Sequence, residues 1–429
     1  MKFLLLALFF LFIPCIFSTE LTTCPIVISS TDNYTLNSQL NSSSYCIQFT
    51  TGSEGSNLDC NGNIINYNGT SSSFEDTGVY IRANNISVRN CIVNNFNENF
   101  FISPLVGGDD NILLYNNSEK NATSQGIRIN TNVENISIIN FEGDSDIYLR
   151  GNNNNNFFRN IVLEGLDSEF RIGALDGASN NVFDNLTFIN SGDMPFYTTS
   201  SYVISNNFFT DITFINYSSN SEAMSVYGEG NYIRDVIFMN STMTDGFFGS
   251  FLSIDGNNNN IQEIIFINST SASDEIEILG DNNNLSDTNN VSLLMYGNFN
   301  TLKNNTFDNL FLQFGLNNSI NDNSVNILAF GLSSINNSIS NSTISSSIFN
   351  SNWSTQPQLF DNNIYNDSLI NSIGCVDNNI NITCDSSFTL LSTVSLNQGT
   401  PTSTSSLFPV SGSIISLMLL LSSLFLFFT

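Results

Sequence analysis

"NNVFDNLTFINS" (residues 180–191) recurs with substitutions as "NNFFTDITFINYS" (206–218), "GNYIRDVIFMNST" (230–242) and "NNNNIQEIIFINST" (257–270). The steps between the lines are 26, 24 and 28 residues, and fainter copies lie at 85–96, 133–143 and 299–314. Two columns result, one of phenylalanine and one of asparagine: Phe188, Phe214, Phe238 and Phe266, followed by Asn190, Asn216, Asn240 and Asn268. A repeat of this period is typical of a solenoid.

The amino-acid composition of the repeat indicates which kind of solenoid the chain forms. Helical repeats are excluded because each unit is rich in Asn, Gly and β-branched residues, with little Ala, Lys or Glu. Leucine-rich repeats are excluded because Ile and Phe dominate and no Leu-x-x-Leu-x-Leu frame persists. Asn-rich disorder is the remaining alternative, but a disordered tract would not keep Phe and Ile in register. We therefore predict a parallel β-helix.

Alternation within each line predicts short strands. Leu186 and Phe188 point inward, and Thr187 and Ile189 outward, at the two-residue period of a strand. Asn-Asn, Asn-Gly and Gly-Asn pairs between the strands favour sharp turns, since Asn and Gly tolerate the left-handed conformation. Stacked coils would lie about 4.8 Å apart, so that Phe packs on Phe and Asn can form ladders with Asn.

The segment "YCIQFTTGSEGSNLDCNGNIINYNG" (45–69), with "GVYIRANNISVRNCIVNNF" (78–96), resembles the opening coils of right-handed parallel β-helix proteins of the pectate-lyase-like superfamily. The specific match covers about fifty residues, and the coil pattern some three hundred. The resemblance implies an all-β chain made of a single right-handed parallel β-helix over 19–395. It leaves function open, because this scaffold carries lyases, hydrolases, epimerases and inert stalks alike.

Charge and composition exclude several functions. The 429-residue chain is 41% hydrophobic but only 11% charged, with a formal net charge of −28. Such a surface repels nucleic acid, whose binding depends on basic side chains. The chain has no histidine, so Ser-His-Asp and Cys-His catalytic units are impossible. We expect no cofactor and no metal site.

Both ends of the chain carry targeting signals. Residues 1–18 contain Lys2, an apolar run and Pro14 before Ser18, which predicts a secretory signal peptide; a retained membrane anchor is the alternative. Residues 414–429 are apolar with no Lys or Arg after them, and small residues at 402–406 precede them in a Ser/Thr-rich linker, 396–413. This order favours a glycosylphosphatidylinositol (GPI) anchor signal, with a plain hydrophobic membrane tail as the alternative.

The six cysteines left after signal removal form an even set in an oxidising compartment, which predicts disulfides that staple the ends of the β-helix. Sequence proximity suggests three pairs: Cys24 with Cys46, Cys60 with Cys91, and Cys375 with Cys384.

Several acidic residues are candidates for catalytic or calcium-binding groups. Asp109 and Asp110 resemble the paired aspartates of polygalacturonases, but adjacent residues on a strand point to opposite faces, so an acidic turn is favoured. Two other sets alternate along the chain: Glu142, Asp144 and Asp146, and Glu275 and Glu277. Calcium prefers six to eight oxygens, so solvated acidic faces are the preferred interpretation.

The arginines that could act as a lyase base are scattered over the coils: Arg128, Arg150, Arg159, Arg171 and Arg234. Ion pairs with neighbouring carboxylates are the expected role. The single tryptophan, Trp353, is interpreted as a partly buried ring rather than a sugar-stacking platform. No catalytic residue is assigned.

About twenty Asn-x-Ser/Thr sequons predict N-glycosylation. The strongest candidates are Asn68, Asn85, Asn135, Asn185, Asn216, Asn240, Asn268 and Asn304.

Together these features predict a glycosylated β-helix secreted to the outer cell surface and anchored in the membrane at its C-terminus. A structural or adhesive, non-catalytic function is favoured, with possible lateral self-association and possible contact with polysaccharide or other surface glycans. The alternative is a polysaccharide-active lyase or glycoside hydrolase. An ice-binding face lacks its regular Thr-x-Thr columns.

Overall fold

The computed structural model describes residues 18–69, 76–104, 110–166, 169–173, 178–192, 194–198, 204–244, 250–272, 274–331, 334–350, 359–361, 364–365 and 383–384. The chain divides into two compact units, Met1–Ser241 with Ser253–Ser269, and Thr242–Leu252 with Thr270–Thr429. No helix occurs among the described residues. The segments predicted as signal peptide, linker and anchor lie outside them, apart from Ser18.

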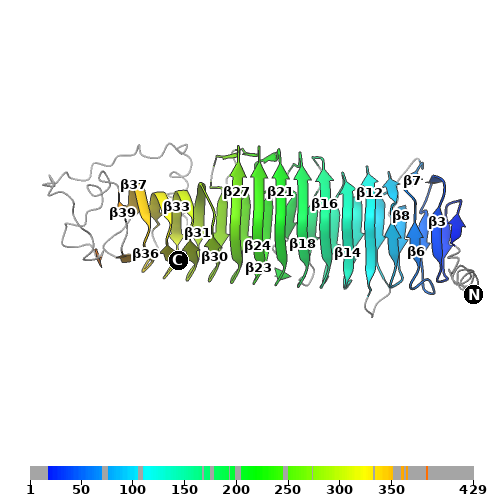
Figure 1. Ribbon diagram of the computed structural model, residues 1–429, viewed down its shortest axis with the longest axis horizontal. Helices are drawn as coiled ribbons and strands as arrows, with labels where there is room; N and C mark the ends of the chain where they lie inside the picture. The colour runs from blue at the N-terminus through cyan, green and yellow to red at the C-terminus, as the bar shows by residue number, and fades with distance from the viewer. Residues whose placement is uncertain are drawn as a thin grey trace, which may run out of the picture. The chain divides into compact units, whose positions relative to one another are not determined.

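Each unit is a stack of parallel β-coils, which confirms the predicted all-β, right-handed parallel β-helix. Within the first unit, successive long strands lie side by side (Figure 1) and pair in parallel with matched register.

Sheet A of the first unit collects one strand from every coil. Its members are β1 (Thr19–Leu21), β3 (Asn33–Leu36), β6 (Asn57–Asp59), β9 (Ser87–Arg89), β12 (Ile112–Lys120), β14 (Ile136–Gly143), β16 (Phe157–Glu164), β18 (Val182–Ile189), β21 (Phe208–Ile215), β24 (Tyr232–Met239) and β27 (Asn260–Ile267). A shorter ladder merges into the second half of β12; it comprises β4 (Leu40–Ser42), β7 (Ile64–Tyr67) and β10 (Ile92–Asn94).

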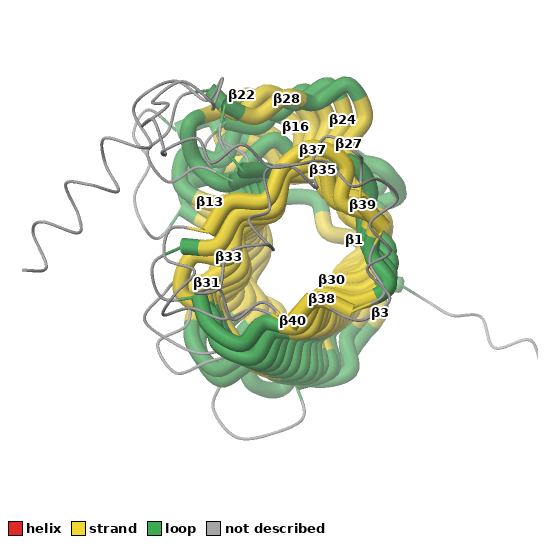
Figure 2. Tube along the Cα trace, turned by 90° about the vertical axis from the view of Figure 1, so that its left-hand side faces the viewer, coloured by secondary structure: helices red, strands yellow, loops and turns green. Residues whose placement is uncertain are grey.

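Sheet B of the first unit lies across the interior from sheet A, as β13 and β1 show in Figure 2. Its strands are β2 (Ile26–Ile28), β5 (Ile47–Phe49), β8 (Thr77–Ile81), β11 (Glu98–Ile102), β13 (Gln125–Ile129), β15 (Ile147–Arg150), β17 (Phe170–Gly173), β19 (Phe196–Thr198) and β23 (Met224–Glu229). Two further strands belong to the same sheet, β20 (Ile204–Ser205), which pairs with β23, and β26 (Leu252–Asp255); β22 (Ser218–Ser219) lies outside it.

The second unit also has two parallel sheets. Sheet C comprises β30 (Asn284–Ser286), β32 (Thr301–Lys303), β34 (Ser319–Asn321), β36 (Ser338–Ser340), β38 (Leu359–Asp361) and β40 (Thr383–Cys384). Sheet D comprises β29 (Ile276–Leu279), β31 (Val291–Tyr296), β33 (Thr306–Phe314), β35 (Ser324–Phe330), β37 (Thr343–Asn350) and β39 (Ile364–Tyr365). A small pair joins β25 (Thr242–Met243) to β28 (Thr270–Ser271).

Aromatic rows fill the interior of the first unit, as the repeat predicts. Phe188, Phe214 and Phe238 are buried. Their rings stack with centroids 5.0 Å apart, and the row continues at the same distance to Phe266. Thr187 and Ile189 point outward as predicted. The stacked rings therefore provide the register signal between coils.

The two residues of each Asn-Asn pair at a corner have different structural roles. The first residue adopts the left-handed conformation, as in Asn180 (φ 56°) and Asn206 (φ 55°), which Asn tolerates better than most residues. The second is buried and accepts a hydrogen bond from the backbone of the preceding coil: Asn207 Oδ1 accepts from the Asn181 N–H at 2.9 Å. The predicted asparagine ladder thus has an exposed and a buried form.

The predicted coil length needs a correction in the second unit. Its buried asparagines recur at steps of 17, 18 and 19 residues, from Asn283 through Asn300 and Asn318 to Asn337. These coils turn two left-handed corners five residues apart, for example at Asn317 and Asp322. Most coils of the first unit from Asn85 onward turn three, for example at Asn180, Asn185 and Asn190. The period of about 25 residues therefore does not extend over the whole chain.

Disulfides Cys24–Cys46 and Cys60–Cys91 join neighbouring coils near the N-terminal end, with Cα atoms 4.8 Å apart in each pair. The side chains of the third predicted pair, Cys375 and Cys384, lie outside the described residues. The described residues contain no helix that could span a membrane.

Candidate functional site

Sheet B of the first unit turns one column of large side chains outward. Strand alternation buries the residues on either side, such as Ile127 and Ile129, and leaves Arg128 between them half-buried. Parallel pairing then aligns the equivalent positions of successive coils. We name this column the aromatic–arginine ladder: Tyr80, Phe101, Arg128, Tyr148, Arg171 and Tyr197.

Neighbouring rungs of the ladder are in direct contact. The rings of Tyr80 and Phe101 stack at 4.7 Å, and the Arg128 guanidinium carbon lies 5.0 Å from the Phe101 ring centroid. Arg171 lies between two rings, 5.0 Å from the centroid of Tyr148 and 5.3 Å from that of Tyr197. These cation–π contacts orient both guanidinium groups on the outer face.

A buried carboxylate adjoins the middle of the ladder. The Glu98 side chain is 1% exposed, and its Oε1 lies 2.5 Å from Nη1 of Arg128. Burial raises the pKa of Glu98, although the hydrogen bond and charge of Arg128 oppose the rise. Within the described part of the chain, Glu98 Oε2 and the Nε atoms of Arg128 and Arg171 are buried without a hydrogen-bond partner. Hydrogen-bonding capacity is therefore left over at these rungs.

Carboxylates and a tyrosine hydroxyl lie at the C-terminal rungs. Burial raises the pKa of Tyr197 to about 12; Arg171 opposes this rise, whereas Glu169 and Asp146 add to it. Tyr197 is therefore protonated at neutral pH and available as a hydrogen-bond donor. Asp146 Oδ1 accepts a hydrogen bond from the Glu169 N–H at 3.1 Å. This end of the ladder combines a donor, a cation and two carboxylates.

Positive charge is concentrated on this face. The chain has ten Lys and Arg residues against 38 Asp and Glu. Four of the ten lie on the outer side of sheet B: Arg128 and Arg171 in the ladder, and Arg82 and Arg150 beside it. In an otherwise acidic chain, this face is the one best suited to an anionic ligand.

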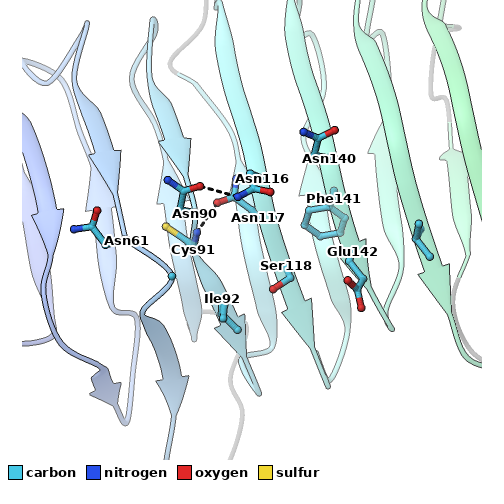
Figure 3. A pocket seen from close by; sticks show the side chains of 12 residues that line it. Asn61, Asn90, Cys91, Ile92, Asn116, Asn117, Ser118, Asn140, Phe141 and Glu142 are labelled. Carbon is cyan, nitrogen blue, oxygen red and sulfur yellow. Dashed lines mark hydrogen bonds between the residues drawn. The ribbon is translucent and has the colours of Figure 1, made fainter.

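A shallow groove lies on the opposite sheet, where the sheet A strands bend (Figure 3). Its floor is the left-handed corner column that contains Asn61, Asn90, Asn116 and Asn140. Asn116 Nδ2 donates to Asn90 Oδ1 at 2.8 Å, so these amides already bond one another. The groove is consequently less suited to a ligand than the ladder.

Three of the predicted arginines are in ion pairs. Arg128 pairs with Glu98, Arg159 Nε lies 2.8 Å from Asp184, and Arg234 contacts the carboxylates of the corner residues Asp235 and Glu263. Arg150 lies in β15, and Arg171 contacts rings instead. Sequence reasoning therefore missed the grouping of Arg128 and Arg171.

The acidic candidates do not converge. Asp144 Oδ1 accepts the Asn121 N–H at 2.6 Å, while Asp146 bonds the Glu169 backbone and Glu142 is exposed. Among the described residues, no group of three or more Cys, Asp or Glu side chains could hold a metal ion.

The remaining acidic candidates and Trp353 do not form a common site among the described residues. Asp110 is buried and accepts the Glu134 N–H at 2.9 Å, whereas Asp109 and Trp353 lie outside the described residues. In the second unit, Glu275 Oε2 accepts the Ser292 N–H at 2.5 Å, and Glu277 lies in β29.

The glycosylation candidates stay predictions, and all but one lie at left-handed corners. The exception is Asn68, which is exposed. The others are Asn85, Asn135, Asn185, Asn216, Asn240, Asn268 and Asn304. Their Nδ2 atoms in several cases donate to the preceding coil, as Asn216 does to Asn190 at 3.1 Å.

The chain matches no family model and no curated protein sequence. Solved structures with a similar fold include the A-modules of two mannuronan C-5 epimerases from Azotobacter vinelandii. AlgE6 is 12% identical with a TM-score of 0.35 over 78% of this chain and 87% of that one; AlgE4 is 11% identical with a TM-score of 0.30 over 78% and 88%. The catalytic domain of a GH87 α-1,3-glucanase in complex with nigerose is 13% identical, with a TM-score of 0.34 over 81% and 60%. The likeness concerns the fold alone.

Proposed function

We propose that this chain is a cell-surface β-helix that binds an acidic polysaccharide along the aromatic–arginine ladder. The observation that carries the proposal is Arg171, held between the rings of Tyr148 and Tyr197 on an outward sheet face. A guanidinium group binds carboxylate or sulfate with two parallel hydrogen bonds. The flanking rings offer apolar faces for the sugar rings.

Coil spacing supports an extended ligand. Arg128 and Arg171 are two coils apart, which separates them by about 10 Å with Tyr148 between. A polymer lying along the ladder would therefore meet cations and rings alternately. This arrangement supports the adhesive form of the structural or adhesive function that the sequence favours, with an acidic polysaccharide as the ligand.

The surroundings of the ladder fit a secreted protein. The predicted signal peptide, glycans and C-terminal lipid anchor or hydrophobic tail would present the face outside the cell. The disulfides Cys24–Cys46 and Cys60–Cys91 support an oxidising compartment. Phosphatidylinositol-specific phospholipase tests the anchor, because release from cells requires the lipid form.

Binding to a polyuronate by the full secreted chain tests the ladder. The variant Arg171→Gln removes a charge-assisted hydrogen-bond donor and is expected to weaken binding about 10- to 100-fold. Arg89→Gln is the matched control, because Arg89 pairs with Asp59 at 2.9 Å on sheet A and is 54% exposed. Equal affinities of wild type and Arg171→Gln would contradict the proposal.

Turnover of the bound polysaccharide is the second candidate, favoured by Asp146 and Glu169 beside Tyr197. Carboxylates at a sugar-binding face can act as general acid or base. The assay follows reducing ends, unsaturated uronate and inverted C5 centres in the same polymer. Product formed by wild type and lost in Asp146→Asn would make the chain an enzyme. Binding without product would make it an adhesin.

A further inference from the structure

The central left-handed corner of sheet A changes chemistry along the first unit. The seven long strands of sheet A are β12, β14, β16, β18, β21, β24 and β27. Each of them bends at one central residue with φ between 53° and 56°. In the first four strands this residue is Asn116, Asn140, Asn160 or Asn185. In the last three it is Asp211, Asp235 or Glu263. We call these last three residues the acidic corner.

The asparagine part of this column is joined by side-chain hydrogen bonds. Nδ2 of Asn160 donates to Oδ1 of Asn140 at 2.8 Å, and Nδ2 of Asn185 donates to Oδ1 of Asn160 at 2.9 Å. A carboxamide can both donate and accept, so each asparagine can hydrogen-bond the asparagines of both neighbouring coils. An ionised carboxylate only accepts. The acidic corner therefore cannot continue the ladder unless it holds a proton.

One cation serves the acidic corner. Nε of Arg234 lies 3.1 Å from Oδ2 of Asp235, and Nη2 lies 3.2 Å from Oε2 of Glu263. The groups that face Asp235 are thus Asp211 from β21, Arg234 from β24 and Glu263 from β27. With all three carboxyls ionised, the corner would carry two uncompensated negative charges.

We propose that the acidic corner is a pH-dependent clasp between β24 and β27. At acidic pH, one proton shared by Asp235 and Glu263 completes the hydrogen bond that an asparagine pair makes elsewhere in the column. At neutral pH the proton is lost, the carboxylates repel, and the corner half of β27 opens more often. The clasp would make local opening of β27 rarer at acidic pH than at neutral pH.

The pKa shifts of the corner carboxyls agree with this geometry. The hydrogen bond with Glu263 raises the pKa of Asp235 to about 6, and burial and the charges of Glu263 and Asp211 add to the rise. The same hydrogen bond lowers the pKa of Glu263, which acts as the acceptor. Between pH 3.8, the ordinary pKa of an aspartate, and about pH 6, Asp235 therefore keeps its proton in the folded state and loses it in the unfolded chain. The stabilisation is present at low pH and is lost as the pH rises through about 6.

Amide hydrogen exchange of residues 260–267 in the full chain tests the clasp, compared at about pH 5 and about pH 7.5 after correction for intrinsic rates. We expect local opening to increase about two- to fivefold at the higher pH, the range for partly exposed charge pairs. In Asp235→Asn, an amide replaces the titrating group, so opening should be equally rare at both values.

A second variant and a control separate the clasp from general charge effects. Glu263→Gln should also remove the pH dependence, because the shared proton needs both carboxyls. Asp184→Asn, which alters the Arg159 pair two coils away, should keep the wild-type response. The proposal is overturned if wild type shows no pH dependence, if Asp235→Asn or Glu263→Gln retains it, or if Asp184→Asn abolishes it.

Discussion

Most coils of the first unit from Asn85 onward have one more left-handed corner than the coils of the second unit. In these first-unit coils left-handed residues occur at three positions five apart, while second-unit coils use two. The extra segment gives the first unit the stacked rings of Phe188, Phe214 and Phe238. Five residues between corners is therefore the structural unit, and the number of corners sets the coil length.

The outward faces differ as well. Sheet B of the first unit presents Arg128 and Arg171 among rings. Sheet D of the second unit presents Glu277, with Tyr296 and the exposed Phe314. Lys303 is the one basic residue of the second unit's sequence. An anionic ligand should thus distinguish the two units.

The largest expected effect comes from breaking the ring stack. Phe214→Ala should destabilise the first unit by about 3–5 kcal/mol, because it opens a cavity between two stacked neighbours. Leu302→Ala in the second unit should cost about 2–3 kcal/mol. Denaturant-dependent hydrogen exchange measures each unit separately. Phe208→Ala, on the same strand but 49% exposed, is the control and should cost less than about 1 kcal/mol.

A buried carboxyl in each unit makes stability depend on pH. Burial raises the pKa of Glu119 to about 7 and that of Glu275 to about 7, from 4.5. The folded state binds the extra proton, so stability is highest at acidic pH and falls as the pH rises from about 4.5 to 7. The fall is at most about 3 kcal/mol per group.

Unfolding measured across this range checks the pH effect. Glu119→Gln should reduce the slope in the first unit alone, and Glu275→Gln in the second alone. Unchanged slopes in both variants would assign the pH dependence to other groups.

The buried asparagine ladder should matter equally in both units. Asn207→Ala deprives the Asn181 N–H of its acceptor, and Asn318→Ala deprives the Asn300 N–H. Each should cost about 1–3 kcal/mol, the penalty for an unsatisfied buried donor. Thermal unfolding compares them with the exposed control Thr51→Ala, which lies outside every Asn-x-Ser/Thr sequon. A neutral result in one unit would show that its coils do not depend on the ladder.

The smallest expected effect is a gain. Phe299 occupies a left-handed corner (φ 59°) where the neighbouring coils have Asn282 and Asn317, and it is 55% exposed. Phe299→Asp should stabilise the second unit by about 0.5–1 kcal/mol, because Asp tolerates this conformation better than Phe and, unlike Asn, creates no sequon with Thr301. A loss of stability on chemical denaturation would mean that the exposed ring makes contacts that the corner comparison overlooks.

Much of the fold could be predicted because it is repeated in the sequence. Phe188 and Phe214 occupy equivalent places in lines that resemble each other, so register followed from alignment. The change to shorter coils was missed because second-unit lines share fewer residues with the first. The left-handed residues at 180, 185 and 190 were a stronger signal. Counting asparagines at five-residue intervals would have found both coil types.

The candidate site was harder to predict. Its rungs are separated by 20 to 27 residues, as between Arg128 and Tyr148 or Phe101 and Arg128. Loops of different length intervene, so no fixed period brings Tyr148, Arg171 and Tyr197 into one column. Sequence reasoning treated the arginines one at a time. The pairing register was needed to show that two of them alternate with rings.

Hydrogen exchange of the full chain with and without a saturating polyuronate tests the central claim most directly. The account predicts protection of the first unit's β11, β13, β15, β17 and β19, and no change in the second unit's β29, β31 and β33. Protection confined to the second unit, or no protection of sheet B at a concentration where binding is measured, would contradict it.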